Sequence, residues 1–147
     1  MTSFFLCILW ALVCAEKEAD EDFKLIATHK PVHHTISEWL ERAQIVLLGG
    51  LVCVFIGLIC NGLSYFSWPL LLWIPAGWAS FTSGFRWFLN RKRGLDWRYT
   101  SPSNLYDSVL IRIASTTAPY RAGAIAYAFE LSILTASTIL YAWTPTH

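Results

Sequence analysis

Two charged residues fall inside long apolar stretches of the sequence, and their side chains have the clearest capacity for chemistry. Glu130 stands near the middle of the stretch 122–143, and Arg86 stands near the end of the stretch 68–89. An ionised carboxylate inside a membrane is costly, so it should face a partner or a wet cavity. If the two stretches pack antiparallel, Arg86 comes within reach of Glu130 and an internal ion pair is expected. The open alternatives are a protonated Glu130, a proton relay, a lipid or quinone contact, and an Arg86 that extends its charged end to the membrane surface.

No other group of residues predicts catalysis or metal binding. His29, His33 and His34 lie close together in one loop, but no Cys or carboxylate accompanies them at a convincing ligand spacing. The apolar stretches contain no histidine for a bis-His haem, and the chain has no phosphate-binding loop or nucleophile elbow. We therefore expect a protein that is not an enzyme, with no catalytic residue, no cofactor and no metal site.

The composition indicates a membrane protein. Of 147 residues, 55% are hydrophobic and only 14% are charged, and the mean hydropathy is +0.44, which is too apolar for an ordinary soluble domain. The alternative is a small soluble protein with one buried central helix, but three long apolar runs favour a chain that crosses a bilayer. The charge runs are too short to suggest binding to nucleic acid.

The ends of the apolar runs predict three transmembrane helices in an all-α fold. Thr35 and Glu38 form a capping-box pattern that starts a helix near Ile36, and residues 43–60 are then free of charge. The second span covers 68–89, where Pro75 should kink the helix, and the third covers 122–143. Between the second and third spans we expect a basic loop, 90–101, and an amphipathic helix, 102–117, that lies on the membrane surface or packs on a partner subunit.

Small residues recur at helical spacing along the first two spans. In lipid, helices associate by close approach of their backbones, and small side chains permit it. The pattern therefore predicts tight helix packing, although it does not identify which helices meet. The packing residues are Gly49, Cys53 and Gly57 on the first span and Ala76, Ser80 and Gly84 on the second.

The N-terminal region allows two interpretations. Residues 1–15 are apolar and could form a retained helix or a cleaved signal peptide, and residues 16–35 form a polar, acidic segment that also contains the histidines. The three-span domain occupies 36–147. Retention of the segment would place the basic loop on the cytosolic or matrix side, as the positive-inside rule prefers. The basic residues of this loop are Arg91, Lys92, Arg93 and Arg98.

From these patterns we expect a non-catalytic integral membrane subunit that packs into a larger complex, with a respiratory-chain or other energy-transducing assembly as the first candidate host. Its expected partners are other membrane subunits and phospholipids. The mitochondrial inner membrane is favoured over the endoplasmic reticulum. The alternatives are a small transporter or channel component that uses Glu130 and Arg86, and a secretory-pathway membrane protein with a cleaved signal.

Overall fold

A computed structural model of the chain describes residues 2–28, 36–61, 71–100, 108–109, 111–112 and 119–143. Within this described part the fold is entirely helical and contains no strand, which confirms the predicted all-α class. The four long helices are α1 (Thr2–Ala27), α2 (Ile36–Asn61), α3 (Trp73–Lys92) and α5 (Pro119–Trp143). Helix α2 begins at the residue expected from its capping signal, while Thr35 itself lies outside the described residues.

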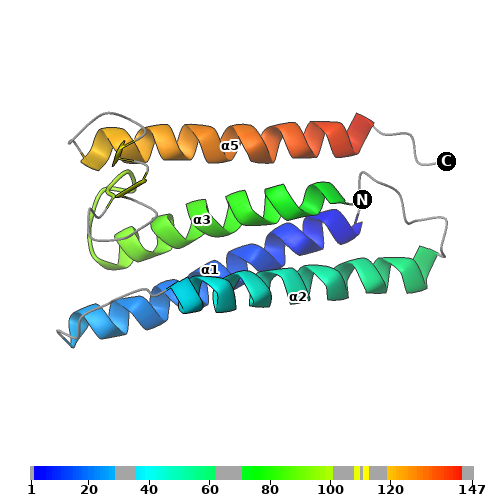
Figure 1. Cartoon of the computed structure of the whole chain (residues 1–147), viewed down its shortest axis with the longest axis horizontal. Coiled ribbons are helices and arrows are strands. Elements are labelled where there is room, and N and C mark those ends of the chain that lie inside the picture. Colours follow the sequence, from blue (N-terminus) through cyan, green and yellow to red (C-terminus); the bar gives the residue numbers. More distant parts are fainter. Residues whose placement is uncertain are drawn as a thin grey trace.

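The four helices run alternately up and down along one long axis (Figure 1). Helix α1 lies between α2 and α3, and α5 packs on the far side of α3. The first residues of α1 and the last residues of α5 therefore lie at the same end of the bundle, where the rings of Phe4 and Tyr141 stack with centroids 4.4 Å apart. The helix closest to the N-terminus thus contacts both α2 and α3, and its most extensive contacts are with α3.

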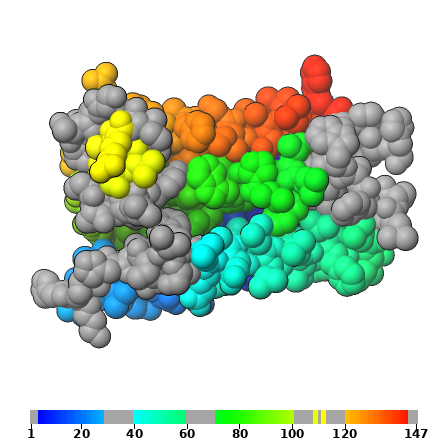
Figure 2. Space-filling view, viewed as in Figure 1, coloured from blue at the N-terminus to red at the C-terminus, as the bar shows by residue number. Residues whose placement is uncertain are grey.

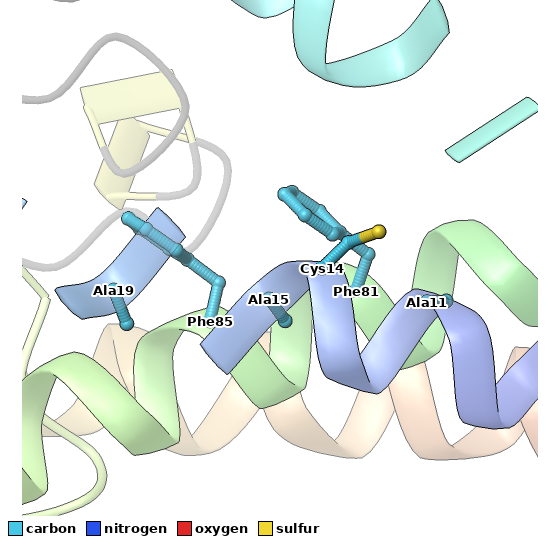
Figure 3. Close-up of a cluster of buried hydrophobic side chains, with 6 residues drawn as sticks. All are labelled: Ala11, Cys14, Ala15, Ala19, Phe81 and Phe85. Atoms are coloured by element: carbon cyan, nitrogen blue, oxygen red, sulfur yellow. The ribbon is translucent and has the colours of Figure 1, made fainter. Parts of the chain in front are cut away.

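A stripe of small residues explains how α1 fits between its neighbours. Cys7, Ala11, Ala15 and Ala19 recur every fourth residue, which places them on one face of the helix, and all four are buried. Figure 3 shows Phe81 and Phe85 of α3 beside the alanines of this stripe. The small side chains leave room for the large rings, so α1 and α3 share one continuous core.

Two helices, not three, are long and apolar enough to cross a membrane in the described part of the chain. The candidate spans are Leu40–Ile59 within α2 and Tyr120–Trp143 within α5. Both present large apolar side chains on their outer faces, among them Leu48 and Phe55 of α2 and Phe129 of α5, each more than half exposed.

The third predicted span, 68–89, is not confirmed. Residues 68–70 lie outside the described part, and α3 begins at Trp73, so only 13 residues precede the charge at Arg86. Several of these are hydroxyl residues, which lower the hydropathy of the helix; the Ser80 and Ser83 hydroxyls donate to the backbone oxygens of Ala76 and Ala79. Pro75 falls in the first turn of α3, where its missing N–H costs no hydrogen bond, so the expected interior kink is not required.

The predicted amphipathic helix, 102–117, is also not confirmed. Most of it lies outside the described residues, and only 108–109 and 111–112 are described, in helical conformation.

Candidate functional site

The charged residues of the chain are gathered at one end of the bundle. Every Lys, Arg, Asp and Glu of the sequence lies in 16–42 or 86–121, or is Glu130. These segments include the second half of α1, the start of α2, the end of α3 and the start of α5, which meet at one end in Figure 1. We call this end the charged end. The opposite halves of the four helices contain no charged side chain. We call this part of the bundle the apolar body, and it has charged residues at one end only.

At the inner margin of the charged end, Arg86 of α3 meets Glu130 of α5. The Nη1 atom of Arg86 donates to Oε2 of Glu130 at 3.1 Å, and Nη2 donates to Oε1 at 3.2 Å. Both side chains are almost completely buried, and the guanidinium also lies over the ring of Tyr127, 5.0 Å from its centroid. The phenol of Tyr127 donates to the backbone oxygen of Ser83 at 3.2 Å. Helices α3 and α5 pack antiparallel, the condition under which an ion pair was expected from the sequence, and the two charges meet as a bidentate pair, the geometry in which Arg binds a carboxylate most strongly.

A second buried cluster joins α1 to α2. The Nε atom of Arg42 lies 2.8 Å from Oε2 of Glu18, and its Nη2 atom donates to Oδ1 of Asp22 at 3.1 Å. Glu18 and Asp22 are four residues apart and therefore lie on one face of α1. Burial raises the pKa of Glu18 above its usual value, against the lowering effect of the Arg42 charge.

A separate ion pair joins α1 to α3. Lys92 lies 2.6 Å from Asp20, and this hydrogen bond lowers the pKa of the Asp20 carboxyl. The acidic segment that follows residue 15 therefore belongs to α1 and docks it on two neighbouring helices. Sequence reasoning missed this role. The spacing of the acids at 18, 20 and 22 could have indicated it, because this spacing places carboxylates on two sides of a helix.

Two of the three small residues predicted on α2, Gly49 and Cys53, contact α1. A Cβ atom on Gly49 would lie only 1.9 Å from the indole of Trp10, whose Nε1 donates to the backbone oxygen of Ile45 at 3.4 Å. Cys53 packs against the buried cluster that contains Phe4, and Gly57 is buried. Gly49 and Cys53 therefore lie against large side chains of α1.

Gly50, which the sequence reasoning did not select, does the same for α3, because a Cβ there would lie 2.1 Å from the ring of Trp73. The predicted residues of α3, Ala76, Ser80 and Gly84, are all buried. A Cβ atom on Gly84 would lie 2.9 Å from Leu12 and 3.4 Å from the Cβ of Ala15, so this stripe contacts α1.

The basic segment after α3 forms an ordered loop. Gly94 has a φ of +67°, and the Leu95 amide donates to the backbone oxygen of Asn90 at 2.9 Å, which ends α3 with a left-handed glycine cap. The Asn90 side chain donates to the backbone oxygens of Trp97 and Tyr99, at 3.3 and 2.7 Å. The loop therefore folds back over the end of the helix that precedes it.

The predicted basic residues of this loop have different surroundings. Arg98 forms an ion pair with Asp96, which lowers the pKa of that carboxyl to about 2. Lys92 faces Asp20 on α1, whereas Arg91 and Arg93 lie over the rings of Trp87 and Tyr99.

A groove of about 450 Å³ runs between α2 and α3. Figure 2 shows this face, with blue atoms of α1 visible between the green and cyan helices. The lining is almost wholly apolar and includes Val46, Trp78 and Phe81, while Arg42 and Thr82 supply its polar groups. A groove of this volume is within the range that accepts a small molecule or an acyl chain.

The described residues contain no group of three or more His, Cys, Asp or Glu side chains placed to hold a metal ion, and the three neighbouring histidines lie outside the described part. Comparison of the chain with protein-family models, with curated proteins and with solved structures found no match. Within the described part, the polar groups of the site join the helices of this chain to one another.

Proposed function

We propose that this chain is a non-catalytic integral membrane subunit that packs into a larger multi-subunit membrane complex and stabilises it. The observation that carries the proposal is the separation of a charge-free, outwardly apolar body from a single charged end. Water would solvate the exposed face of α2 poorly, whereas lipid tails or neighbouring helices match it. The groove between α2 and α3 offers the same neighbours a recessed apolar contact.

We further propose that α3 is a third membrane-embedded helix, although its hydropathy is lower. It is shielded by α1 on one side and by α5 on the other, so its hydroxyl groups and Arg86 need not face lipid. Residues 102–117 are proposed to lie along the membrane surface near the charged end.

The packing of α1 favours its retention over cleavage as a signal peptide. Removal of residues 1–15 would expose the buried stripe of α3 at Ala76, Ser80 and Gly84. It would also detach Glu18 and Asp22 from the helix turns that hold them against Arg42. On the positive-inside rule the charged end then faces the cytosol or matrix, and the start of α1 and the end of α5 face the opposite side.

The host complex is proposed to be an energy-transducing assembly such as a respiratory-chain complex, in the mitochondrial inner membrane in preference to the endoplasmic reticulum. This choice rests on the many small accessory subunits that such complexes contain. The experiment is blue-native electrophoresis of mildly solubilised membranes, with mass spectrometry of the co-migrating proteins and of the N-terminal peptide of this chain. Migration in a large stoichiometric assembly with Met1 present supports the proposal. A monomer or small homo-oligomer that begins at Glu16 overturns it in favour of a secretory-pathway protein.

A second candidate function is a transporter or channel component in which Arg86 and Glu130 form part of a polar path. The observation in its favour is the burial of both charges between α3 and α5. Their bidentate contact favours a structural pair, because each carboxylate oxygen already accepts a hydrogen bond. Ion or proton flux through liposomes that contain the purified chain, abolished by Glu130→Gln, would favour transport.

A further inference from the structure

Basic and aromatic side chains are interleaved where the loop after α3 meets the start of α5. The Arg91 guanidinium lies 5.1 Å from the ring centroid of Trp87, and those of Arg93 and Arg98 lie 5.6 Å from Tyr99 and Trp97. The ring of Tyr99 also contacts that of Tyr120, with centroids 5.9 Å apart, and the exposed Arg121 follows directly. We call this surface the basic rim; it consists of Arg91, Arg93, Arg98, Arg121, Trp87, Trp97, Tyr99 and Tyr120.

The basic rim has an excess of positive charge. Asp96 is bound by Arg98 through both carboxylate oxygens. Within the described part of the chain, Arg91, Arg93 and Arg121 have no carboxylate within ion-pair distance. Three guanidinium groups at this surface are therefore not neutralised by any carboxylate among the described residues.

Stacking on an aromatic ring orients a guanidinium without using its N–H donors. The planar edge of the group then remains available for a bidentate contact, and phosphate oxygens match that geometry as well as carboxylate oxygens do. Trp87, Trp97 and Tyr120 are each about 40% exposed or more, and exposed aromatic rings of this kind prefer the headgroup region of a bilayer. Cationic donors and aromatic rings thus lie together at the charged end, next to the apolar part of the bundle.

We propose that the basic rim is a binding site for the phosphate groups of anionic phospholipids in the leaflet next to the charged end. The inference rests on the proposed function, because it requires the apolar body to be embedded in a bilayer. A zwitterionic headgroup fits less well, since its ammonium group would need a carboxylate, and Asp96, the acid in the described part of this loop, is already paired with Arg98. Each basic side chain at an anionic surface contributes about fivefold to the affinity.

The test uses the full chain in an uncharged detergent, titrated with brominated phosphatidylglycerol or brominated phosphatidylcholine. Quenching of tryptophan fluorescence reports contact, and Trp87 and Trp97 place two reporters in the rim. The variant is R91Q/R93Q/R121Q, which leaves the Asp96–Arg98 pair intact. The matched control is K17Q/K24Q, because both lysines are exposed on α1 outside the rim.

The original chain should bind phosphatidylglycerol at a mole fraction at least tenfold lower than phosphatidylcholine, with a preference that weakens as salt is added. The triple variant should lose most of this preference, and the control should keep it within about twofold. Retention of the preference in the triple variant, equal quenching by the two lipids in the original chain, or abolition by an equal concentration of inorganic phosphate would each overturn the inference. Quenching of the original chain by neither lipid would overturn the proposed membrane function itself, whereas equal quenching by both lipids leaves that function standing.

Discussion

A Cβ atom on Gly123 of α5 would lie 1.7 Å from the backbone oxygen of Arg98. The loop after α3 therefore rests directly on the first turns of α5, and the contact holds the basic rim in place. Because the opposing atom belongs to the backbone, no rotation of a side chain can relieve the clash that a methyl group would create.

We expect Gly123→Ala to lower the stability of the protein by about 2–3 kcal/mol, the usual cost of overpacking. The measurement is the melting temperature of the purified chain in detergent. Gly77→Ala is the matched control, because a Cβ there meets Trp73 at an ordinary 3.9 Å and alanine is the better helix former by up to about 1 kcal/mol. Equal melting temperatures for the two variants would show that the loop does not rest on α5 as described.

The buried pair of Arg86 and Glu130 gives a second prediction. Glu130→Gln leaves the guanidinium without its counter-charge, and loss of one partner of a buried pair costs about 3–5 kcal/mol. Thermal unfolding of the purified chain should show this loss. Replacement of both groups by apolar residues, Arg86→Met with Glu130→Leu, should recover most of the stability because no charge is then left buried. A Glu130→Gln protein as stable as the original would contradict the pair, and would favour a Glu130 that is neutral in the folded state.

The sequence predicted the helices that contain one long, uninterrupted apolar run. The apolar runs of α2 and α5 are long and end at charged or capping residues, so their positions could be read directly. The span expected at 68–89 is not confirmed, because Pro75, the hydroxyl residues and Arg86 each interrupt its apolar pattern. In the structure α1 and α5 pack against α3, and hydropathy along the sequence contains no information on these tertiary contacts.

The position of α1 could not have been predicted from its composition. Its apolar half is too short to span a bilayer, and its acidic half resembles a solvated segment. Only the spacing of Cys7, Ala11, Ala15 and Ala19 indicates the buried face, and such a stripe does not predict which helix packs on it. For the same reason Gly49 could be recognised as a packing residue, whereas its partner, the indole of Trp10, could not.

This contact gives a third prediction. We expect Gly49→Ala to displace Trp10 and to separate α1 from α2, with a loss of about 1–3 kcal/mol in stability. Trp10→Leu in the same chain should restore part of that loss by removing the ring that clashes. Leu51→Ala is the control, because Leu51 is 55% exposed on the outer face of α2. Melting temperatures in detergent measure all three effects, and a Gly49→Ala chain that melts with the original would show that α1 does not pack here.

The cluster of Glu18, Asp22 and Arg42 predicts a specific dependence on pH. An acid whose pKa is higher in the folded than in the unfolded chain binds its proton more tightly when folded. Stability therefore falls as pH rises from the ordinary value of Glu18, near 4.5, through its raised folded pKa, and then levels off. Glu18→Gln removes the buried carboxylate and with it this loss of stability at higher pH. The melting temperature at pH 7 should therefore rise by a few degrees, since the Asp22 carboxylate still balances the charge of Arg42.

The measurement is a series of melting temperatures between pH 4.5 and 8, a range above that in which the carboxyls of Asp20 and Asp96, whose pKa values are lowered, take up protons. Glu16→Gln is the control, because Glu16 is exposed on the same helix and should leave the fall in place. A Glu18→Gln chain that melts at a lower temperature at pH 7 would mean that the attraction of Arg42 outweighs the cost of burying the carboxylate. The acidic face of α1 would then stabilise the bundle through charge, and its docking would strengthen with pH instead of weakening.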